Sequence, residues 1–270
     1  MTLLVLKIGG SVRDPEALLQ DVAETAADGT THVVLVHGAS RDLNELSTRL
    51  GHPPRMVESG RGDVTRFTDA TTMDHFLMAY AGLANKRIVE RLRQLGANAI
   101  GLSGLDAGIV QGRRRPDLRV VANGRPRVLH DNFVGGIERV DTSLLRVLLE
   151  RGFLPVLTPP IAAEDGTAIN VDGDRMASEV AIALGSDELV IFADTPGILR
   201  DPQDESTLVD VVRSGDLDAL GLSGRVRPKL QATLRAAERG VAAVRIADGR
   251  GDRPLQTALA GAGTAIEGAG

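Results

Sequence analysis

The feature that most constrains the fold is an apolar run near the N-terminus, Leu3 to Ile8, which contains one lysine and is followed by two glycines. Such a run is typical of a strand that is covered on both faces, as in parallel sheets with helices on each side. Lys7 is therefore unexpected, because a buried lysine is rare unless a negative charge pairs with it. We expect Lys7 to point at an anion that Gly9 and Gly10 allow to approach the backbone closely. The alternative is a lysine that reaches solvent from an ordinary strand end.

Lysine is scarce in this chain, and its positions are therefore informative. Of the 31 basic residues, only Lys7, Lys86 and Lys229 are lysines. A site that needs a compact point charge does not accept the wide planar fork of arginine. Lys86 falls in a long helical pattern and is expected to be a solvated helix residue. Lys7 and Lys229 both stand beside glycine-containing loops, and we expect them to serve an anion site.

Apolar strand patterns and amphipathic helix patterns alternate along most of the chain. Strands are predicted at 3–8, 32–38, 98–104, 153–160, 188–194 and 243–249, and helices at 16–28, 40–50, 71–95, 141–152, 177–184 and from about 229. This order predicts right-handed crossovers and an α/β fold with a mostly parallel sheet. Since ligands collect at the carboxyl ends of such strands, the segments 7–10 and 37–40 are expected to face one crevice. Residues 51–68 break the pattern, and we expect a flexible excursion that carries Arg66.

Composition excludes several classes of protein. The formal net charge of −5 gives no global attraction to nucleic acid or to a membrane surface. The chain has no cysteine, so it has neither disulfides nor thiolate metal sites. Its start shows no secretory signal pattern, and no apolar run approaches the length that spans a membrane. We therefore expect a cytoplasmic protein without a nucleic-acid or membrane partner.

One segment opposes the overall negative charge. Between positions 113 and 127 the chain has six arginines and one aspartate, a local net charge of +5. Short strands are predicted here, with Asn123 and Gly124 as a hairpin turn. A solvated hairpin is one interpretation. The other is a docking surface for an acidic macromolecule, since concentrated charge steers association.

The second half of the chain adds candidates for chemistry. Asn170 and Asp174 are four residues apart at a predicted helix start, which would place both on one face of the first turn. Helix capping is the alternative explanation for this pair. Two lysines held by a carboxylate would suit phosphoryl transfer, which needs charge neutralisation on the transferring group. The phosphate-binding loop G-x-x-x-x-G-K-[ST] and the protein-kinase signatures are absent from the sequence.

Four ordered strings resemble the amino acid kinase family over nearly the whole chain: KIGGS, HGAS, NVDGD and GRVRPK. Six further strings, LGHPPR, VTRFTD, GLANKR, ANAIGLSGLD, GRRR and LPVLTPP, are similar to the acetylglutamate kinase group. Within that group they resemble the branch that phosphorylates 2-aminoadipate held on the small carrier protein LysW.

The resemblance implies an open three-layer αβα sandwich with a mostly parallel central sheet. It implies a lobe 1–166 that binds the acceptor and a homodimer partner, and a lobe 167–270 that binds ATP with Mg²⁺. It assigns catalysis to Lys7 and Lys229, oriented by Asp174. By the same resemblance, the acceptor would be held by Gly38, Ala39, Ser40, Arg66 and Asn170, and the nucleotide by Gly9, Gly10, Ser11, Asp194 and Gly197. An acidic LysW-like carrier would dock on Arg113, Arg114, Arg115, Arg119, Arg125 and Arg127.

One position departs from the family pattern. The related turns read HGGG or HGGS, whereas Ala39 takes the second glycine position here. A methyl group there would cost about 1 kcal/mol or more if the backbone needed a positive φ. The acceptor pocket is therefore expected to differ from that of the relatives.

The implied reaction is ATP-dependent phosphorylation of the side-chain carboxylate of 2-aminoadipate, which gives an acyl phosphate. A carboxylate with a pKa of roughly 4.3 is already ionised at neutral pH, so its attack on phosphorus needs no general base. Three acceptors stay open besides carrier-bound 2-aminoadipate: free N-acetylglutamate, carrier-bound glutamate and a modified acceptor of a secondary pathway. A non-catalytic amino-acid sensor on the same fold is a further alternative, although Lys7, Lys229 and Asp174 are all retained.

Overall fold

The computed structural model describes residues 1–10, 12, 14–59, 64–122, 125–216 and 226–268. Its α-helices are α1 Glu16–Ala27, α2 Ser40–Arg49, α3 Ala70–Phe76, α4 Asn85–Gln94, α5 Ser143–Glu150, α6 Gly173–Leu184, α7 Val226–Glu238 and α8 Pro254–Leu259, and a π-helix, η1 Leu77–Ala84, joins α3 to α4. Three 3-10 turns are η2 Asp106–Gly108, η3 Glu205–Thr207 and η4 Ser214–Asp216. The strands are β1 Thr2–Ile8, β2 Thr31–His37, β3 Arg55–Ser59, β4 Val64–Phe67, β5 Ala99–Gly104, β6 Val110–Arg114, β7 Leu118–Ala122, β8 Arg125–Leu129, β9 Gly135–Val140, β10 Leu154–Ala162, β11 Ala168–Ile169, β12 Glu188–Ala193, β13 Val211–Arg213, β14 Ala243–Asp248 and β15 Thr264–Glu267.

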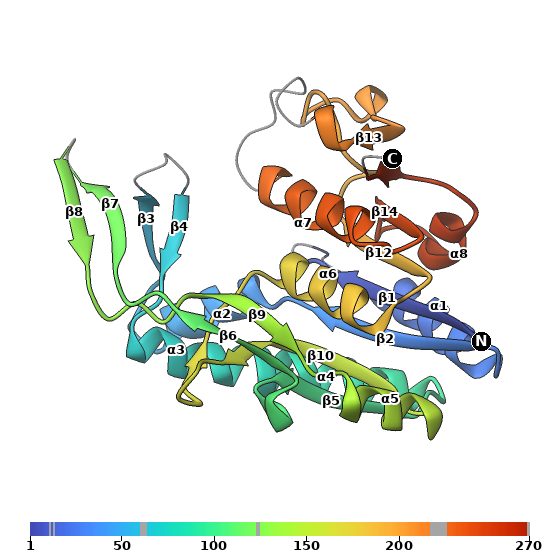
Figure 1. Cartoon of the computed structure of the whole chain (residues 1–270), viewed down its shortest axis with the longest axis horizontal. Coiled ribbons are helices and arrows are strands. Elements are labelled where there is room, and N and C mark those ends of the chain that lie inside the picture. The colour runs from blue at the N-terminus through green and yellow to red at the C-terminus, as the bar shows by residue number, and fades with distance from the viewer. Residues whose placement is uncertain (11, 13, 60–63, 123–124, 217–225, 269–270) are drawn as a thin grey trace.

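A central sheet of 11 strands organises the molecule (Figure 1). Its main path is β13-β15-β14-β12-β1-β2-β10-β6-β9, and β5 and β11 both pair with β10. The inner pairs β14–β12, β12–β1, β1–β2 and β2–β10 are all parallel, whereas β6–β9, β10–β11 and β14–β15 are antiparallel. The prediction of an α/β fold with a mostly parallel sheet is confirmed.

Strand β1 is covered on both faces, as its apolar run predicted. Val5 belongs to a core cluster with Met176 and Val180 of α6, on the same side of the sheet as α5 and α7. Leu4 and Leu6 belong to a second cluster with residues of α1, α4 and α8 on the opposite side. Because side chains alternate along a strand, Lys7 points to the same face as Val5, toward α6.

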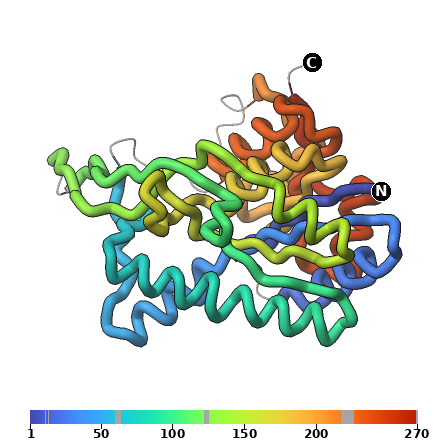
Figure 2. The backbone as a smooth tube through the Cα atoms, turned by 60° about the horizontal axis from the view of Figure 1, so that its bottom comes forward, coloured from blue at the N-terminus to red at the C-terminus, as the bar shows by residue number. Residues whose placement is uncertain are grey.

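A second, four-stranded antiparallel sheet, β4-β3-β7-β8, projects from the main body (Figures 1 and 2). The prediction of a flexible excursion over 51–68 is wrong for its described part, because residues 55–59 and 64–67 form β3 and β4. The short strands predicted between 110 and 130 are confirmed, with β7 paired to β8. The predicted turn residues Asn123 and Gly124 lie outside the described residues.

Two helix predictions need correction. The segment predicted as one helix over 71–95 is a continuous helix in three parts, α3, η1 and α4. Its middle part, Leu77 to Ala84, is π-helical. Helix α6 begins at Gly173 rather than at Ala177, because the Asp172 side chain caps it by accepting from the Arg175 N–H at 2.9 Å. No described helix combines the length and apolar character needed to cross a membrane.

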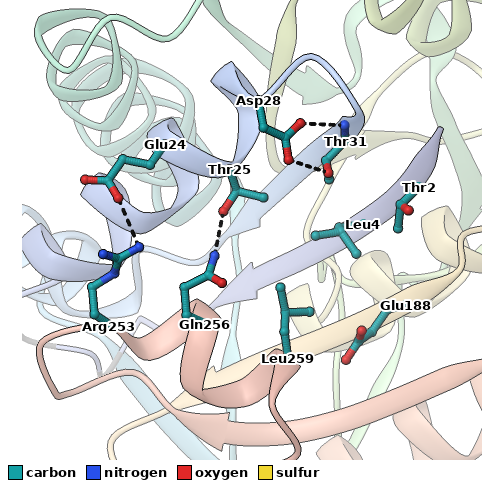
Figure 3. A pocket seen from close by; sticks show the side chains of 10 residues that line it. All are labelled: Thr2, Leu4, Glu24, Thr25, Asp28, Thr31, Glu188, Arg253, Gln256 and Leu259. Carbon is teal, nitrogen blue, oxygen red and sulfur yellow. Dashed lines mark hydrogen bonds and ion pairs between the residues drawn. The ribbon is translucent and has the colours of Figure 1, made fainter.

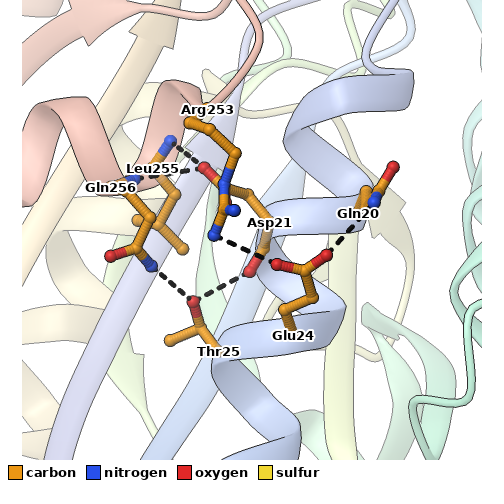
Figure 4. Close-up of polar contacts among 7 residues, drawn as sticks. All are labelled: Gln20, Asp21, Glu24, Thr25, Arg253, Leu255 and Gln256. Atoms are coloured by element: carbon orange, nitrogen blue, oxygen red, sulfur yellow. Dashed lines mark hydrogen bonds and ion pairs between the residues drawn. The ribbon is translucent and has the colours of Figure 1, made fainter.

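The C-terminal segment is tied back to the first helix of the chain (Figure 4). The fully buried Asp21 carboxylate of α1 accepts from the Arg253 Nε at 2.5 Å and from the N–H groups of Leu255 and Gln256 at 2.9 and 3.1 Å. Gln256 also donates to the Thr25 hydroxyl at 3.1 Å. Asp21 thus caps α8 from another helix.

A cavity of about 460 Å³ lies beside this junction and includes Thr2, Thr31, Glu188 and Leu259 in its lining (Figure 3). Thr2, Thr31 and Glu188 begin the parallel strands β1, β2 and β12. The cavity is therefore at the amino ends of these strands, whereas Lys7 is at the carboxyl end of β1. A ligand that reaches Lys7 binds at the opposite edge of the sheet.

Candidate functional site

Lys7, Asp174 and Lys229 form one buried charged cluster. The Lys7 ammonium pairs with Asp174 Oδ1, and the Lys229 ammonium lies 3.1 Å from Asp174 Oδ2. The three side chains are 7%, 11% and 18% exposed for Lys7, Asp174 and Lys229 respectively. Strand β1, the first turn of α6 and the first turn of α7 supply one residue each. The cluster combines two positive charges with one negative charge, and this surplus suits an anion.

The charge states in this cluster depend on one another. Burial alone would raise the pKa of Asp174, but the ammonium groups of Lys7 and Lys229 outweigh it and hold that pKa well below its usual range. The N-terminus of α6 also favours a negative charge there. Burial lowers the pKa of Lys229, and the charge of Lys7 lowers it further against the attraction of Asp174. Keeping both lysines protonated therefore costs free energy until an anion binds beside them. A phosphoryl group is an anion that would fill this role.

Backbone turns surround the cluster at the carboxyl ends of neighbouring strands. The Gly9 N–H donates to the Phe192 carbonyl at 3.2 Å, and the Gly38 N–H donates to the Ile8 carbonyl at 3.1 Å. A Cβ atom at Gly10 would lie 3.0 Å from the Ser40 backbone nitrogen and 2.9 Å from its hydroxyl. Glycine at position 10 thus lets the first turn and the start of α2 approach closely, as expected for segments that face one crevice.

Ala39 takes its place in the turn without backbone strain. Its φ is −145°, so this position does not need the left-handed conformation that favours glycine. The residue is 1% exposed and belongs to a core cluster with Leu43, Met73 and Phe76. The departure from the family pattern therefore adds a packed methyl group rather than a strained peptide.

Arg66 and Asn170, the other predicted acceptor residues, are held by contacts across elements. The Arg66 guanidinium donates to the side-chain oxygen Oδ1 of Asn44 in α2 at 2.5 Å. The Asn170 amide nitrogen is 3.4 Å from the Thr68 hydroxyl, just beyond β4. The expectation that Asn170 shares the first helical turn with Asp174 is wrong, because Asn170 precedes the cap of α6 and bridges to Val134 instead.

Tyr80 of η1 is a buried residue near the Gly38–Ser40 turn that the sequence reasoning missed. Burial raises the pKa of its hydroxyl, the Arg66 charge and the Ala39 N–H lower it, and the Asp172 charge raises it. Of these groups, Ala39 contacts Tyr80 directly, since the two residues also belong to one core cluster. A lone tyrosine inside an apolar helix pattern carries no sequence signal for such a position.

The predicted nucleotide residues are only partly described. Gly9 and Gly10 follow β1, and Asp194 is exposed at the end of β12. Gly197 is buried in the next turn, where a Cβ would lie 2.5 Å from the Thr264 hydroxyl. Ser11 lies outside the described residues. Among the described residues, no group of three or more His, Asp or Glu side chains is arranged to hold a metal ion.

The six predicted docking arginines do not form one uniform surface. Arg113 lies 3.0 Å from Glu138 and 3.4 Å from Glu164, and the Arg114 guanidinium stacks 3.7 Å above the Phe133 ring. Arg115 is exposed just after β6. The other three, Arg119, Arg125 and Arg127, are exposed on the β7–β8 hairpin.

The hairpin register separates its arginines. Arg119 is paired with Val128, and Arg127 is paired with Val120, the residue next to Arg119. Paired residues share a face and adjacent residues do not, so Arg119 lies on the face opposite Arg125 and Arg127. By the same alternation through β3 and β4, Arg119 shares its face with Arg66.

Comparison with known proteins agrees with the motifs. The model of the amino acid kinase family matches residues 2–248. A protein of Deinococcus radiodurans named [LysW]-aminoadipate kinase is 42% identical over 98% of this chain and 92% of its own length. Its namesake from Thermus thermophilus is 41% identical over 98% of this chain and all of its own length. The acetylglutamate kinase of Methanopyrus kandleri is 39% identical over 87% and 91% of the two chains.

Solved structures agree on the fold. N-acetylglutamate synthase of Neisseria gonorrhoeae, bound to coenzyme A and L-arginine, matches with a TM-score of 0.75 at 25% identity, over 98% of this chain and 61% of its own. Giardia carbamate kinase matches over 99% of both chains with a TM-score of 0.68 at 14% identity. The match of the family model, the near full-length relatives and the paired lysines lead to one conclusion: the chain belongs to the amino acid kinase family.

Proposed function

We propose that this protein transfers the γ-phosphoryl group of ATP to the side-chain carboxylate of 2-aminoadipate that is carried on a LysW-like amino-group carrier protein. The observation that carries the proposal is the buried Lys7–Asp174–Lys229 cluster at the carboxyl end of the sheet. The two relatives named [LysW]-aminoadipate kinase support the acceptor. The product is an acyl phosphate.

In this proposal the two lysines stabilise the charge that develops on the transferring group. Lys7 and Lys229 pair with different oxygens of the Asp174 carboxylate, which orients both ammonium groups. The acceptor carboxylate is ionised at neutral pH, so no side chain has to remove a proton from it. Mg²⁺ bound to the nucleotide supplies further charge neutralisation.

The predicted acceptor and nucleotide residues keep their roles as part of the proposal. Lobe 1–166 binds the acceptor and a homodimer partner, and lobe 167–270 binds ATP. The acceptor is held by Gly38, Ala39, Ser40, Arg66 and Asn170, and the nucleotide by Gly9, Gly10, Ser11, Asp194 and Gly197. Strand β1 of the first lobe pairs in parallel with β12 of the second within one sheet.

We place the carrier on the face of the projecting sheet that contains Arg66 and Arg119. Four apolar side chains on this face are exposed, Met56, Val64, Val121 and Val128, by 46%, 70%, 36% and 46%. The exposed Glu58 lies on the same face, so its two arginines leave the apolar patch with a net positive charge, which suits a protein partner of negative charge. The carrier would then present its bound amino acid from the side of Arg66.

The proposal is tested by measuring ADP release with three acceptors: carrier-bound 2-aminoadipate, carrier-bound glutamate and free N-acetylglutamate. We expect carrier-bound 2-aminoadipate to give the highest kcat/KM. Lys229→Met should lower kcat by about 10³-fold or more, because the transition-state charge loses one of its two cations. Circular dichroism and the unfolding midpoint check that this variant is folded.

Two results would contradict the proposal in different ways. Preference for free N-acetylglutamate would reject the carrier as the source of the acceptor. Full activity of the folded Lys229→Met variant would reject the two-lysine mechanism whatever the acceptor.

A further inference from the structure

A buried polar network lies at the carboxyl end of β2, directly before the Gly38–Ser40 turn. His37 is fully buried, and its Nε2 lies 3.1 Å from the Asn85 amide nitrogen. Asn85, only 1% exposed, also donates from that nitrogen to the Val156 carbonyl at 3.0 Å. Its oxygen accepts from the Lys86 ammonium at 3.2 Å. The network therefore runs from an ammonium group at the start of α4 to the turn.

The two ends of the network fix the orientation of the Asn85 amide. The Lys86 ammonium can only donate and the Val156 carbonyl can only accept, so the amide oxygen faces Lys86 and the nitrogen faces His37. His37 Nε2 must then accept, and its proton is carried on Nδ1. That nitrogen lies 3.4 Å from the Gly38 carbonyl oxygen, within the turn itself.

Further contacts restrict the conformations of the side chains in this network. Lys86 also donates to the Gly101 carbonyl at 3.2 Å. A Cβ at Gly101 would lie 2.0 Å from the Asn85 oxygen and 2.7 Å from the Lys86 ammonium, so only glycine leaves room for both groups. On the other side, the buried Thr158 hydroxyl donates to the His37 carbonyl at 3.2 Å. Two of the motifs, GLANKR and ANAIGLSGLD, meet here.

We propose that Lys86, Asn85 and His37 are positioning residues for the acceptor. The network holds His37 neutral in one tautomer and thereby holds the Gly38–Ser40 turn in one conformation. This inference rests on the proposed function, because it takes the acceptor to bind at that turn. All three lysines of the chain then serve one site: Lys7 and Lys229 at the phosphoryl group, and Lys86 through Asn85 and His37.

Steady-state kinetics of Lys86→Met test the coupling. We expect the KM for the acceptor to rise about tenfold, since a charge-assisted hydrogen bond is lost and Asn85 becomes free to reorient. The KM for ATP and the thermal unfolding midpoint should stay close to those of the wild type. Arg87→Met is the matched control, because Arg87 is an exposed neighbour outside the network. An acceptor KM equal to that of the control would overturn the proposal.

Asn85→Asp gives a second signature that a merely structural role would not produce. The new carboxylate offers no donor to His37 Nε2. Neutral His37 can restore that contact only in the other tautomer, which removes the proton from Nδ1, so both ring contacts form together only when His37 is protonated. The charges that influence His37 are those of Lys7 from β1 and Lys86 from α4. We expect the acceptor KM of this variant to fall toward the wild-type value as the pH is lowered from 8 to 6. A pH-independent defect would contradict the proposal.

The tautomer itself is observable without any substrate. In ¹⁵N-histidine-labelled protein, with His37 assigned by His37→Gln, we expect a neutral ring protonated on Nδ1 from pH 6 to 8. Lys86→Met should shift the Nε2 resonance. A ring protonated on Nε2 would overturn the proposal. This measurement distinguishes failure of the network proposal from failure of the proposed function, because it reports the His37 tautomer even if no carrier-bound acceptor is phosphorylated.

Discussion

The protonation states of single residues in this protein are set by neighbours that are distant in sequence. Asp174 stays ionised in a buried position because the ammonium groups of Lys7 and Lys229 each pair with one of its carboxylate oxygens. Removing either lysine leaves the carboxylate one partner, whereas removing Asp174 leaves two buried ammonium groups face to face. The cluster is therefore one unit, and substitutions within it will not have additive effects.

His37 makes a prediction at the residue scale. Burial, with smaller contributions from Lys7 and Lys86, lowers its pKa from 6.5 to about 4, against the opposing effect of the Gly38 carbonyl. Between these two values the unfolded chain binds more protons than the folded protein, so stability rises with pH. Lowering the pH from 7.5 to 5 should cost about 2 kcal/mol of unfolding free energy through this residue.

The measurement is urea unfolding at both pH values for the wild type and for His37→Gln. The variant lacks the titrating group, so its loss of stability on acidification should be smaller by that amount. Equal losses in the two proteins would show that His37 does not titrate between these pH values.

At the scale of elements, the ends of α6 and α8 are set by side-chain caps. Asp172 caps α6 locally, so its first turn carries Asp174 toward β1. Helix α8 has no cap from its own N-terminal residue, and Asp21 of α1 supplies one. The buried carboxylate thereby holds the C-terminal segment against the first helix.

We therefore expect Asp21→Ala to lower the free energy of unfolding by about 2–4 kcal/mol, because two N–H groups and a guanidinium lose their acceptor. Glu24→Ala is the control: its carboxylate pairs with the same Arg253 at 3.0 Å but is 48% exposed. The control should cost no more than about 1 kcal/mol. Chemical denaturation measures both, and equal small effects would contradict the capping role.

The π-helix η1 determines which side chains of the following helix α4 face the core. Its wider turns change the direction in which the following side chains point. After Leu77–Ala84, the polar residue Asn85 faces the core rather than solvent. A continuous α-helical reading of 71–95 has no reason to bury an asparagine, and the network of Lys86, Asn85 and His37 was therefore not expected from the sequence.

At the scale of the whole molecule, the projecting sheet has two different faces, and this allows a paired experiment on carrier docking. Arg119→Glu alters the face shared with Arg66, whereas Arg125→Glu with Arg127→Glu alters the opposite face. We expect the first change to raise the KM for carrier-bound substrate about five- to tenfold at low salt and less at high salt. The second pair should have little effect.

The same assay covers the arginines on and after β6. Arg114 is a poor choice for charge reversal, because its guanidinium packs on Phe133 and its Nε donates to the Asn132 carbonyl at 2.9 Å. Arg113 and Arg115 are exposed and can be reversed in the same way. If neither face of the sheet nor these two arginines alters the KM, the carrier does not use this basic segment.

The sequence alone determined the features that depend on local pattern and on residue chemistry. Apolar strands alternating with amphipathic helices predicted the parallel sheet, since strands buried on both faces cannot alternate with polar residues. The scarcity of lysine pointed to Lys7 and Lys229 as an anion site, and the resemblance carried by the ordered motifs added Asp174. These signals are readable because each resides within a few neighbouring residues.

Only the tertiary structure decided what depends on contacts between distant segments. The cap of α8 joins residues more than 230 positions apart, and no local pattern encodes such a partner. The strands β3 and β4 are short and lie in a segment rich in Gly and Pro, so no local pattern predicts them. They belong to a sheet because β3 pairs with the distant strand β7. Likewise, Lys86 is exposed on α4 as the sequence predicted, and only the fold shows that its ammonium group also lies within hydrogen-bond distance of Asn85 and the Gly101 carbonyl. Burial and long-range hydrogen bonding, rather than propensity, settle these positions.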